Sequence, residues 1–122
     1  MSLTQNDSET VLLHNPNCSK SRATKALLAE REIPFRERLY LKEPLDQSEL
    51  EELEACLGRP IASWVRTRES AYQEAGLSAD SSAEDLRSAV AERPILMERP
   101  IVVKGGAARV GRPPEDVLEL FD

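Results

Sequence analysis

Cys18 is the residue of this 122-residue chain whose type and setting best fit a catalytic role. It follows a short apolar run and a proline-containing loop, at a point where we expect a helix to begin. Unpaired backbone N–H groups and the dipole at a helix start stabilise a thiolate, so such thiols have pKa values of about 3.5 to 7.5. Because Cys18 lies in a polar run, the sequence predicts a nucleophilic thiol rather than a packed structural one.

The same loop does not supply a second sulfur for redox chemistry. Ser21 stands three residues after Cys18, so the Cys-x-x-Cys motif of dithiol enzymes is absent. Cys56 falls beside the apolar face of a predicted helix and is interpreted as a core thiol, so a redox cycle at Cys18 needs an external thiol. One histidine and two distant cysteines give no ligand pair at metal spacing, and we expect no metal site and no bound cofactor.

Three arginines lie near the elements that would surround this thiol. Arg22 follows Cys18 by about one helical turn, and Arg99 and Arg112 flank a predicted hairpin. The planar guanidinium fork suits a tetrahedral oxyanion better than the point charge of lysine does. Most arginines are nevertheless solvated or paired at the surface, so residue type alone does not establish an oxyanion site.

The elements that must position these residues begin with a strand, a tight loop and a helix. Residues 10–14 form an apolar run typical of a buried strand, and apolar spacing predicts a helix over about residues 18–32. Residues 35–41 alternate as a second strand would, with Leu41 on the inner face and Tyr40 on the outer one. The inner face of the helix is expected to carry Ala23, Ala26, Leu27 and Ala29.

Between residues 46 and 93 the patterns predict helices and no strand. Asp46 and Glu49 are spaced as a capping box, and Gly58 is placed to end that helix. Shorter helices are expected over residues 61–66, 69–75 and from Ser82 onward.

A hairpin over residues 100–110 and a last helix from Pro113 complete the chain, with Val117, Leu118 and Phe121 expected inside. The order of elements predicts a single α/β domain over residues 1–122, a thioredoxin-like mixed sheet with an all-helical insertion at about 46–93. The order of elements supports this fold name only by analogy.

The charge balance bears on the partners. With 22 acidic and 16 basic residues, the net charge of −6 argues against nucleic acid or an anionic membrane, both of which need a basic face. No apolar run reaches the roughly 20 residues that span a bilayer, and the first residues lack the features of a secretory signal. We therefore expect a cytoplasmic protein.

Three runs of the sequence resemble the arsenate reductase family that works with glutaredoxin and glutathione. They are HNPNCSKSR over residues 14–22, ERPIVV over 98–103 and ARVGRPPE over 108–115. The resemblance extends from about Thr10 to Phe121 in the same order and spacing. It implies a thioredoxin-like sheet with a helical insert, which agrees with the reading of the residues.

The resemblance also implies a reaction. In this family one cysteine attacks arsenate, glutathione displaces a hydroxide from arsenic, and glutaredoxin releases arsenite. Cys18 matches that cysteine, and His14 matches a histidine thought to favour its thiolate form. The oxyanion-binding arginines of the family match Arg66, Arg99 and Arg112, and the family's arginine-proline bond implies a cis peptide at Arg99.

Two other functions remain open on the sequence. One is a general monothiol oxidoreductase that acts on glutathione mixed disulfides, in which the arginines would bind glutathione carboxylates. The other is a regulator that binds RNA polymerase, like the related Spx proteins, although those proteins typically carry Cys-x-x-Cys where this chain has Cys18 and Ser21.

Overall fold

A computed structural model describes residues 3–6 and 8–121, which contain a four-stranded mixed sheet. The strands are β1 (Thr10–Leu13), β2 (Arg36–Arg38), β3 (Ile101–Lys104) and β4 (Ala107–Val110), in the spatial order β2-β1-β3-β4. β2 is parallel to β1, whereas β3 is antiparallel to both β1 and β4. The mixed α/β sheet that the sequence predicts is confirmed.

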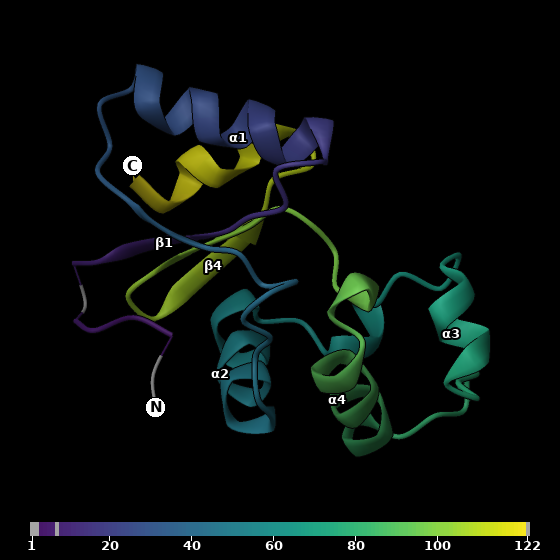
Figure 1. Ribbon diagram of the computed structural model, residues 1–122. Coiled ribbons are helices and arrows are strands. Elements are labelled where there is room, and N and C mark those ends of the chain that lie inside the picture. Colours follow the sequence, from purple (N-terminus) through teal and green to yellow (C-terminus); the bar gives the residue numbers. More distant parts are fainter. Residues whose placement is uncertain (1–2, 7, 122) are drawn as a thin grey trace.

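Helices connect β1 to β2 and β2 to β3, and they cover both faces of the sheet (Figure 1). The α-helices are α1 (Ser19–Glu30), α2 (Gln47–Leu57), α3 (Ser70–Glu74) and α4 (Ala83–Glu92). Three 3₁₀-helices are also present: η1 (Ile61–Ser63), η2 (Pro94–Leu96) and η3 (Pro114–Phe121). Figure 1 shows α1 and the yellow C-terminal helix on one side of the sheet, with α2 on the other.

Successive side chains of a strand point to opposite faces of the sheet. Because helices cover both faces, the central strands are buried on both sides. Leu12 and Val102 pack with Leu28 of α1 and Val117 of η3 in one core. Val11 and the other inward residues of β1 and β3 join a larger core with α2 and α4. The loop after β1 therefore leaves the sheet from a rigid base, and this loop carries Cys18.

The inner face of α1 differs from the one expected. Ser21, Thr24 and Leu28 are its buried residues, so the expected apolar face is wrong. Small polar side chains fit here because η3 and the preceding loop pack closely on α1. A Cβ atom at Gly111 would lie 2.7 Å from the Thr24 hydroxyl oxygen, and that hydroxyl donates to the Lys20 carbonyl at 3.0 Å.

Strand alternation also predicts the wrong burial for Tyr40 and Leu41. β2 ends at Arg38, and a turn in which the Lys42 and Glu43 N–H groups donate to the Leu39 carbonyl breaks the period of two. As a result Tyr40 is 0% exposed and Leu41 is 38% exposed. Tyr40 thus enters the larger core from a loop.

The residues between β2 and β3 fold as helices, and one short extended segment among them matters for the site. The capping box of Asp46 and Glu49 is present, and α2 ends at Gly58 with a φ of 67°. The helix expected over residues 61–66 stops at Ser63, because Val65 forms a β-bridge with Met97. This bridge holds the chain around Arg66 next to the segment that leads into β3.

The C-terminal element is a 3₁₀-helix in which Val117 is buried. Leu120 and Phe121 pack against the smaller core, whereas Leu118 is not part of it, so that expectation is corrected. Among the described residues, none of the helices is both long enough and apolar enough to cross a membrane.

Candidate active site

Cys18 is the N-cap residue of α1, and its own N–H donates to the Asn15 carbonyl at 3.0 Å. Burial of the thiol raises its pKa, but this is outweighed by hydrogen bonds from the Ser21 N–H, the Arg99 side chain and the Lys20 N–H. The charge of Arg99 acts in the same direction. The pKa of Cys18 therefore lies below the ordinary thiol value of 9.0, which enriches the nucleophilic thiolate.

His14 lies behind Cys18 at the end of β1, with 3% of its surface exposed. Its Nδ1 is 2.6 Å from the Ser21 hydroxyl oxygen, which also accepts the Asn15 N–H at 3.0 Å. Nε2 lies 3.7 Å from a Glu37 carboxylate oxygen, so the geometry suits the tautomer with its proton on Nε2.

Burial lowers the pKa of His14 below 6.5, and the positive charges of Lys25 and Arg22 add to this although the Glu37 carboxylate opposes it. A neutral His14 adds no positive charge beside the thiol. Its described hydrogen bond goes to Ser21, so an influence of His14 on Cys18 passes through Ser21, which also donates its N–H to the thiol.

Arg99 is the arginine that the structure brings to Cys18. Its peptide bond to Pro100 is cis, as predicted, and the Arg112–Pro113 bond is cis as well. The Arg99 Nε and Nη1 atoms are buried without a hydrogen-bond partner in the described part of the chain. Two donor nitrogens of this guanidinium are thus available to a ligand with oxygen acceptors.

Arg66 and Arg112 line a neighbouring cavity of about 550 Å³. There Arg66 pairs with Glu69 at 2.6 Å, and Arg112 pairs with Glu98 at 3.4 Å. The cavity is lined by Val65, Arg66, Thr67, Arg68, Glu69, Glu98 and Arg112. Arg112 also contacts the arginine beside Cys18, because its Nε donates to the Arg99 carbonyl oxygen at 2.8 Å.

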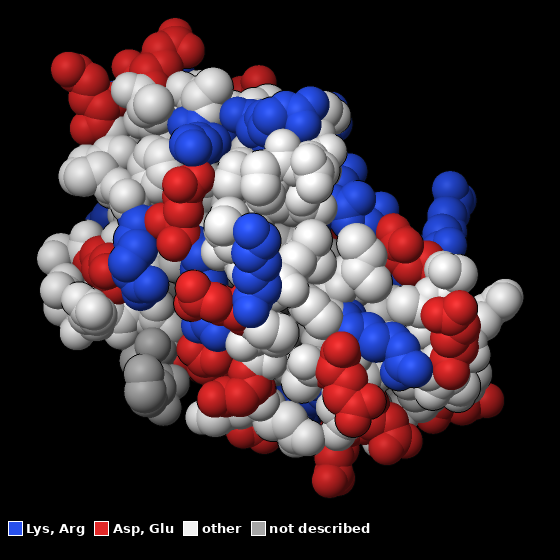
Figure 2. Space-filling view, in the orientation of Figure 1, with Lys and Arg blue, Asp and Glu red and all other residues white. Residues whose placement is uncertain are grey.

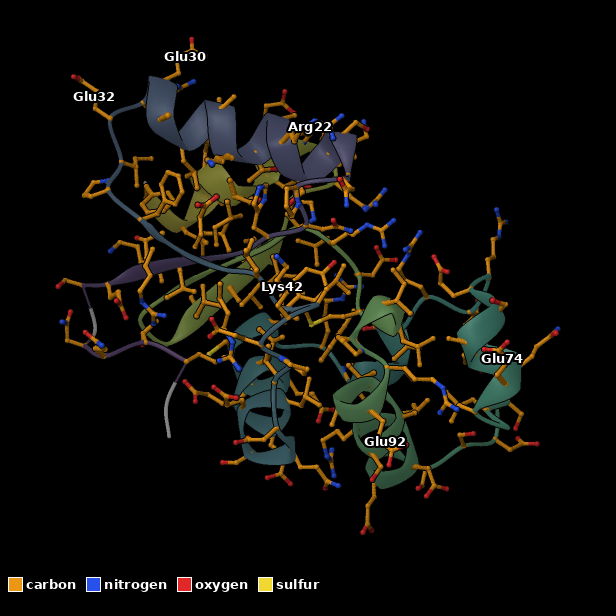
Figure 3. The ribbon with its side chains drawn as sticks, viewed as in Figure 1. Arg22, Glu30, Glu32, Lys42, Glu74 and Glu92 are labelled. Atoms are coloured by element: carbon orange, nitrogen blue, oxygen red, sulfur yellow. The ribbon has the colours of Figure 1, made fainter. Side chains whose placement is uncertain are left out.

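Arg22 has a structural contact. Its guanidinium donates to the Pro16 carbonyl at 2.9 Å, which ties the start of α1 to the loop before it, where Figure 3 labels the residue. Figure 2 shows Lys and Arg side chains gathered around this end of α1, whereas Asp and Glu predominate over α2 and α4. On this face the start of α1 is therefore more basic than the surface over α2 and α4.

Tyr40 is a site residue that the sequence did not reveal, because alternation placed it outside. Its hydroxyl is buried and has no hydrogen-bond partner among the described residues. Burial raises its pKa to about 12, with Arg99, Cys18 and Asn15 close enough to act on it. Glu37 was also missed, although its place in the second strand opposite the His14 strand was a usable signal.

Cys56 lies on α2, partly buried against the larger core. Burial raises the pKa of its thiol, and the negative charge of Glu52 raises it further. The two cysteines thus have opposite shifts. In the described residues no group of three or more His, Cys, Asp or Glu side chains is arranged to hold a metal ion.

Comparisons with known proteins relate this arrangement to one family. The model of the ArsC family matches residues 13–120. An arsenate reductase from Haemophilus influenzae is 40% identical over 113 residues, which cover 91% of this chain and 97% of that protein. An uncharacterized protein of Escherichia coli is 46% identical over 111 residues, covering 89% of this chain and 93% of that one.

A solved structure has the same fold. The arsenate reductase from Vibrio cholerae superposes with a TM-score of 0.87 and 44% identity, over 93% of this chain and 98% of that one. The predicted thioredoxin-like fold and the predicted family are both confirmed by these matches.

Proposed function

The chain belongs to the ArsC family, and we propose that it is an arsenate reductase whose nucleophile is Cys18. The observation that carries the proposal is a thiol of lowered pKa beside a guanidinium with two unpartnered donor nitrogens. A thiolate needs such a donor set to react with an oxyanion, because two negative charges must approach each other. The arsenate reductases among its relatives support the substrate.

In the first step the Cys18 sulfur bonds to arsenic, and a hydroxyl group of arsenate leaves as water after it takes up a proton. The thiol of glutathione then replaces a second hydroxyl group in the same way. A glutaredoxin thiolate attacks the glutathione sulfur, and the electron pair of the sulfur–arsenic bond stays on arsenic, which is reduced from As(V) to As(III). Water releases arsenite and restores the Cys18 thiolate.

Each residue of the site has its own role in these steps. The N–H groups at the start of α1 and the Arg99 guanidinium favour the thiolate form of Cys18. Arg99 offers donors to the charge that develops on the arsenate oxygens, and preorganised donors of this kind act most strongly where water is excluded. Arg66 and Arg112 would complete the oxyanion site by leaving their carboxylate partners. His14 would hold Ser21, whose N–H faces the thiol.

A second candidate function is a monothiol oxidoreductase acting on glutathione mixed disulfides. The cavity with Arg66, Arg68 and Arg112 favours it, because guanidinium groups also bind carboxylates and glutathione carries two. Under this hypothesis Cys18 attacks a disulfide sulfur in place of arsenic.

A coupled assay tests the proposal. Arsenate-dependent consumption of NADPH is measured with glutathione, glutaredoxin and glutathione reductase for the wild type, Cys18→Ser and the matched control Cys56→Ser. We expect turnover in the wild type and in Cys56→Ser, and only the background rate in Cys18→Ser. Turnover of a glutathione mixed disulfide without arsenate turnover would replace the proposal with the second candidate. Full activity of Cys18→Ser would show that Cys18 is not the nucleophile.

A further inference from the structure

The Tyr40 hydroxyl is a buried polar group that the proposed reaction steps do not use. The residue is 0% exposed, and its oxygen has no hydrogen-bond partner among the described residues. A buried hydroxyl without a partner is unfavourable, and such groups are rare in folded proteins. Its position therefore requires an explanation.

The groups around the hydroxyl are donors. Arg99 lies beside it and can only donate, and its Nε and Nη1 are themselves without a partner. Asn15 is the other polar neighbour, and its side-chain oxygen accepts the Asn17 N–H at 3.0 Å but not the proton of the Tyr40 hydroxyl. Donors can satisfy the lone pairs of the Tyr40 oxygen but not its proton. The proton needs an acceptor that comes from outside or from Cys18.

We propose that Tyr40 is a substrate-binding residue, whose hydroxyl donates a hydrogen bond to an oxygen of the oxyanion that reacts with Cys18. The Tyr40 hydroxyl and two unpartnered donor nitrogens of Arg99 then lie close to one another. A set of donors without an acceptor selects a ligand with unprotonated oxygens, which describes a tetrahedral oxyanion such as arsenate or phosphate. The inference rests on the proposed function for its site.

The neutral state of Tyr40 fits this role. Its pKa of about 12, raised by burial, keeps the proton on the hydroxyl at neutral pH. An ionised tyrosine would repel both the thiolate and the oxyanion. Tyr40 is held by the larger core and not by the hydrogen bonds of its own hydroxyl, so the donor is placed before the ligand arrives.

Equilibrium protection of Cys18 tests the role without needing turnover. In a Cys56→Ser background, the rate of Cys18 alkylation by iodoacetamide is measured against increasing phosphate, and separately against arsenate. Tyr40→Phe is compared with Tyr72→Phe, which alters the other tyrosine of the chain on α3. We expect Tyr40→Phe to raise the half-protecting concentration by roughly tenfold to a hundredfold, as for a lost hydrogen bond to a charged group. Tyr72→Phe should leave it unchanged.

Two further readouts separate this role from others. Tyr40→Phe should melt at the same temperature as the parent protein or higher, because the buried unpartnered hydroxyl is removed. The alkylation midpoint of Cys18 without oxyanion should stay in place. If Tyr40→Phe does not fold, 3-fluorotyrosine incorporated into the Tyr72→Phe chain gives Tyr40 a stronger donor. The half-protecting concentration should then fall.

The outcomes distinguish this inference from the proposed function. Unchanged protection in Tyr40→Phe, or in the fluorotyrosine protein, overturns the inference even if arsenate is reduced. A shifted alkylation midpoint with unchanged protection also overturns it, because the hydroxyl would then serve the thiolate. Protection that depends on Tyr40 without arsenate turnover supports the inference and refutes the proposed function. A wild type that neither oxyanion protects overturns the inference.

Discussion

Arginines predicted to share one role occur in two different states in this molecule. Arg99, beside Cys18, has two buried donor nitrogens without a hydrogen-bond partner, and no described carboxylate pairs with it. Arg66 and Arg112, in the neighbouring cavity, are each paired with a carboxylate, Glu69 and Glu98 respectively. An oxyanion can bind Arg99 directly but must compete with Glu69 and Glu98 for the others. Residue type therefore identifies candidates, whereas the partners decide which of them are ready to bind.

Removing Arg99 should have the largest effect. Arg99→Ala eliminates charged donors that act on the thiolate and on the oxyanion, and losing even one donor of this kind costs about a hundredfold to a thousandfold in turnover. We expect kcat/KM for arsenate to fall by about a hundredfold or more, with only partial recovery in Arg99→Lys. Steady-state kinetics measure this. An Arg99→Ala enzyme close to wild type would leave the thiolate without its assigned counter-charge.

Removing Arg112 or Arg66 should have a smaller effect. Each substitution loses a guanidinium that is already partly neutralised by its carboxylate, so we expect a decrease of about tenfold in kcat/KM. The same assay measures both variants beside Arg68→Ala, which alters the other arginine of the cavity. If either variant lost as much kcat/KM as Arg99→Ala, the carboxylate partners of Arg66 and Arg112 would make no difference to their contribution.

Releasing Arg112 should improve binding. Glu98→Gln keeps the size of the side chain but removes the charge that competes with an oxyanion, so we expect the half-protecting phosphate concentration to fall by about a few fold. Glu74→Gln, at an exposed position on α3 labelled in Figure 3, is the matched control for charge. Weaker protection in Glu98→Gln would mean that Glu98 holds Arg112 in its binding position.

Arg99 and Arg112 should also differ in their effect on the pH dependence of Cys18 alkylation. Arg99 helps to lower the pKa of Cys18, so Arg99→Ala should move the midpoint of Cys18 alkylation to higher pH, whereas Arg112→Ala should not. In the wild type Cys18 should react below the ordinary thiol range and Cys56 above it. Mass spectrometry of the alkylated protein distinguishes the sites. Faster modification of Cys56 at neutral pH would contradict the assignment.

The smallest effect concerns stability at acid pH. Because the folded pKa of His14 lies below 6.5, the unfolded chain binds more protons than the folded one below that pH. The free energy of unfolding should therefore fall as the pH drops from 7 through 6.5, and His14→Gln should reduce this slope. Urea unfolding at several pH values measures it. An equal slope in His14→Gln would indicate that His14 is not protonated on unfolding.

Much of the fold followed from local patterns. The capping box at Asp46 and the helix end at Gly58 were predictable because capping is satisfied by residues close in sequence. Tyr40 was not, because a turn interrupted the alternation after β2. The inner face of α1 was misread for a related reason, since Ser21 and Thr24 are buried against His14 and Gly111, which lie outside the helix.

The sequence by itself identified the candidate nucleophile. Cys18 follows a strand and begins a helix, and the donors that stabilise its thiolate include the N–H groups of the same helical turn. Only the tertiary structure decided which cations and hydroxyls meet it. Arg99 and Tyr40 reach Cys18 from the segment before β3 and the loop after β2, while Arg66 and Arg112 are held by carboxylates in a separate cavity. Such long-range placement arises from the packing of the whole sheet and its helices, and no local spacing encodes it.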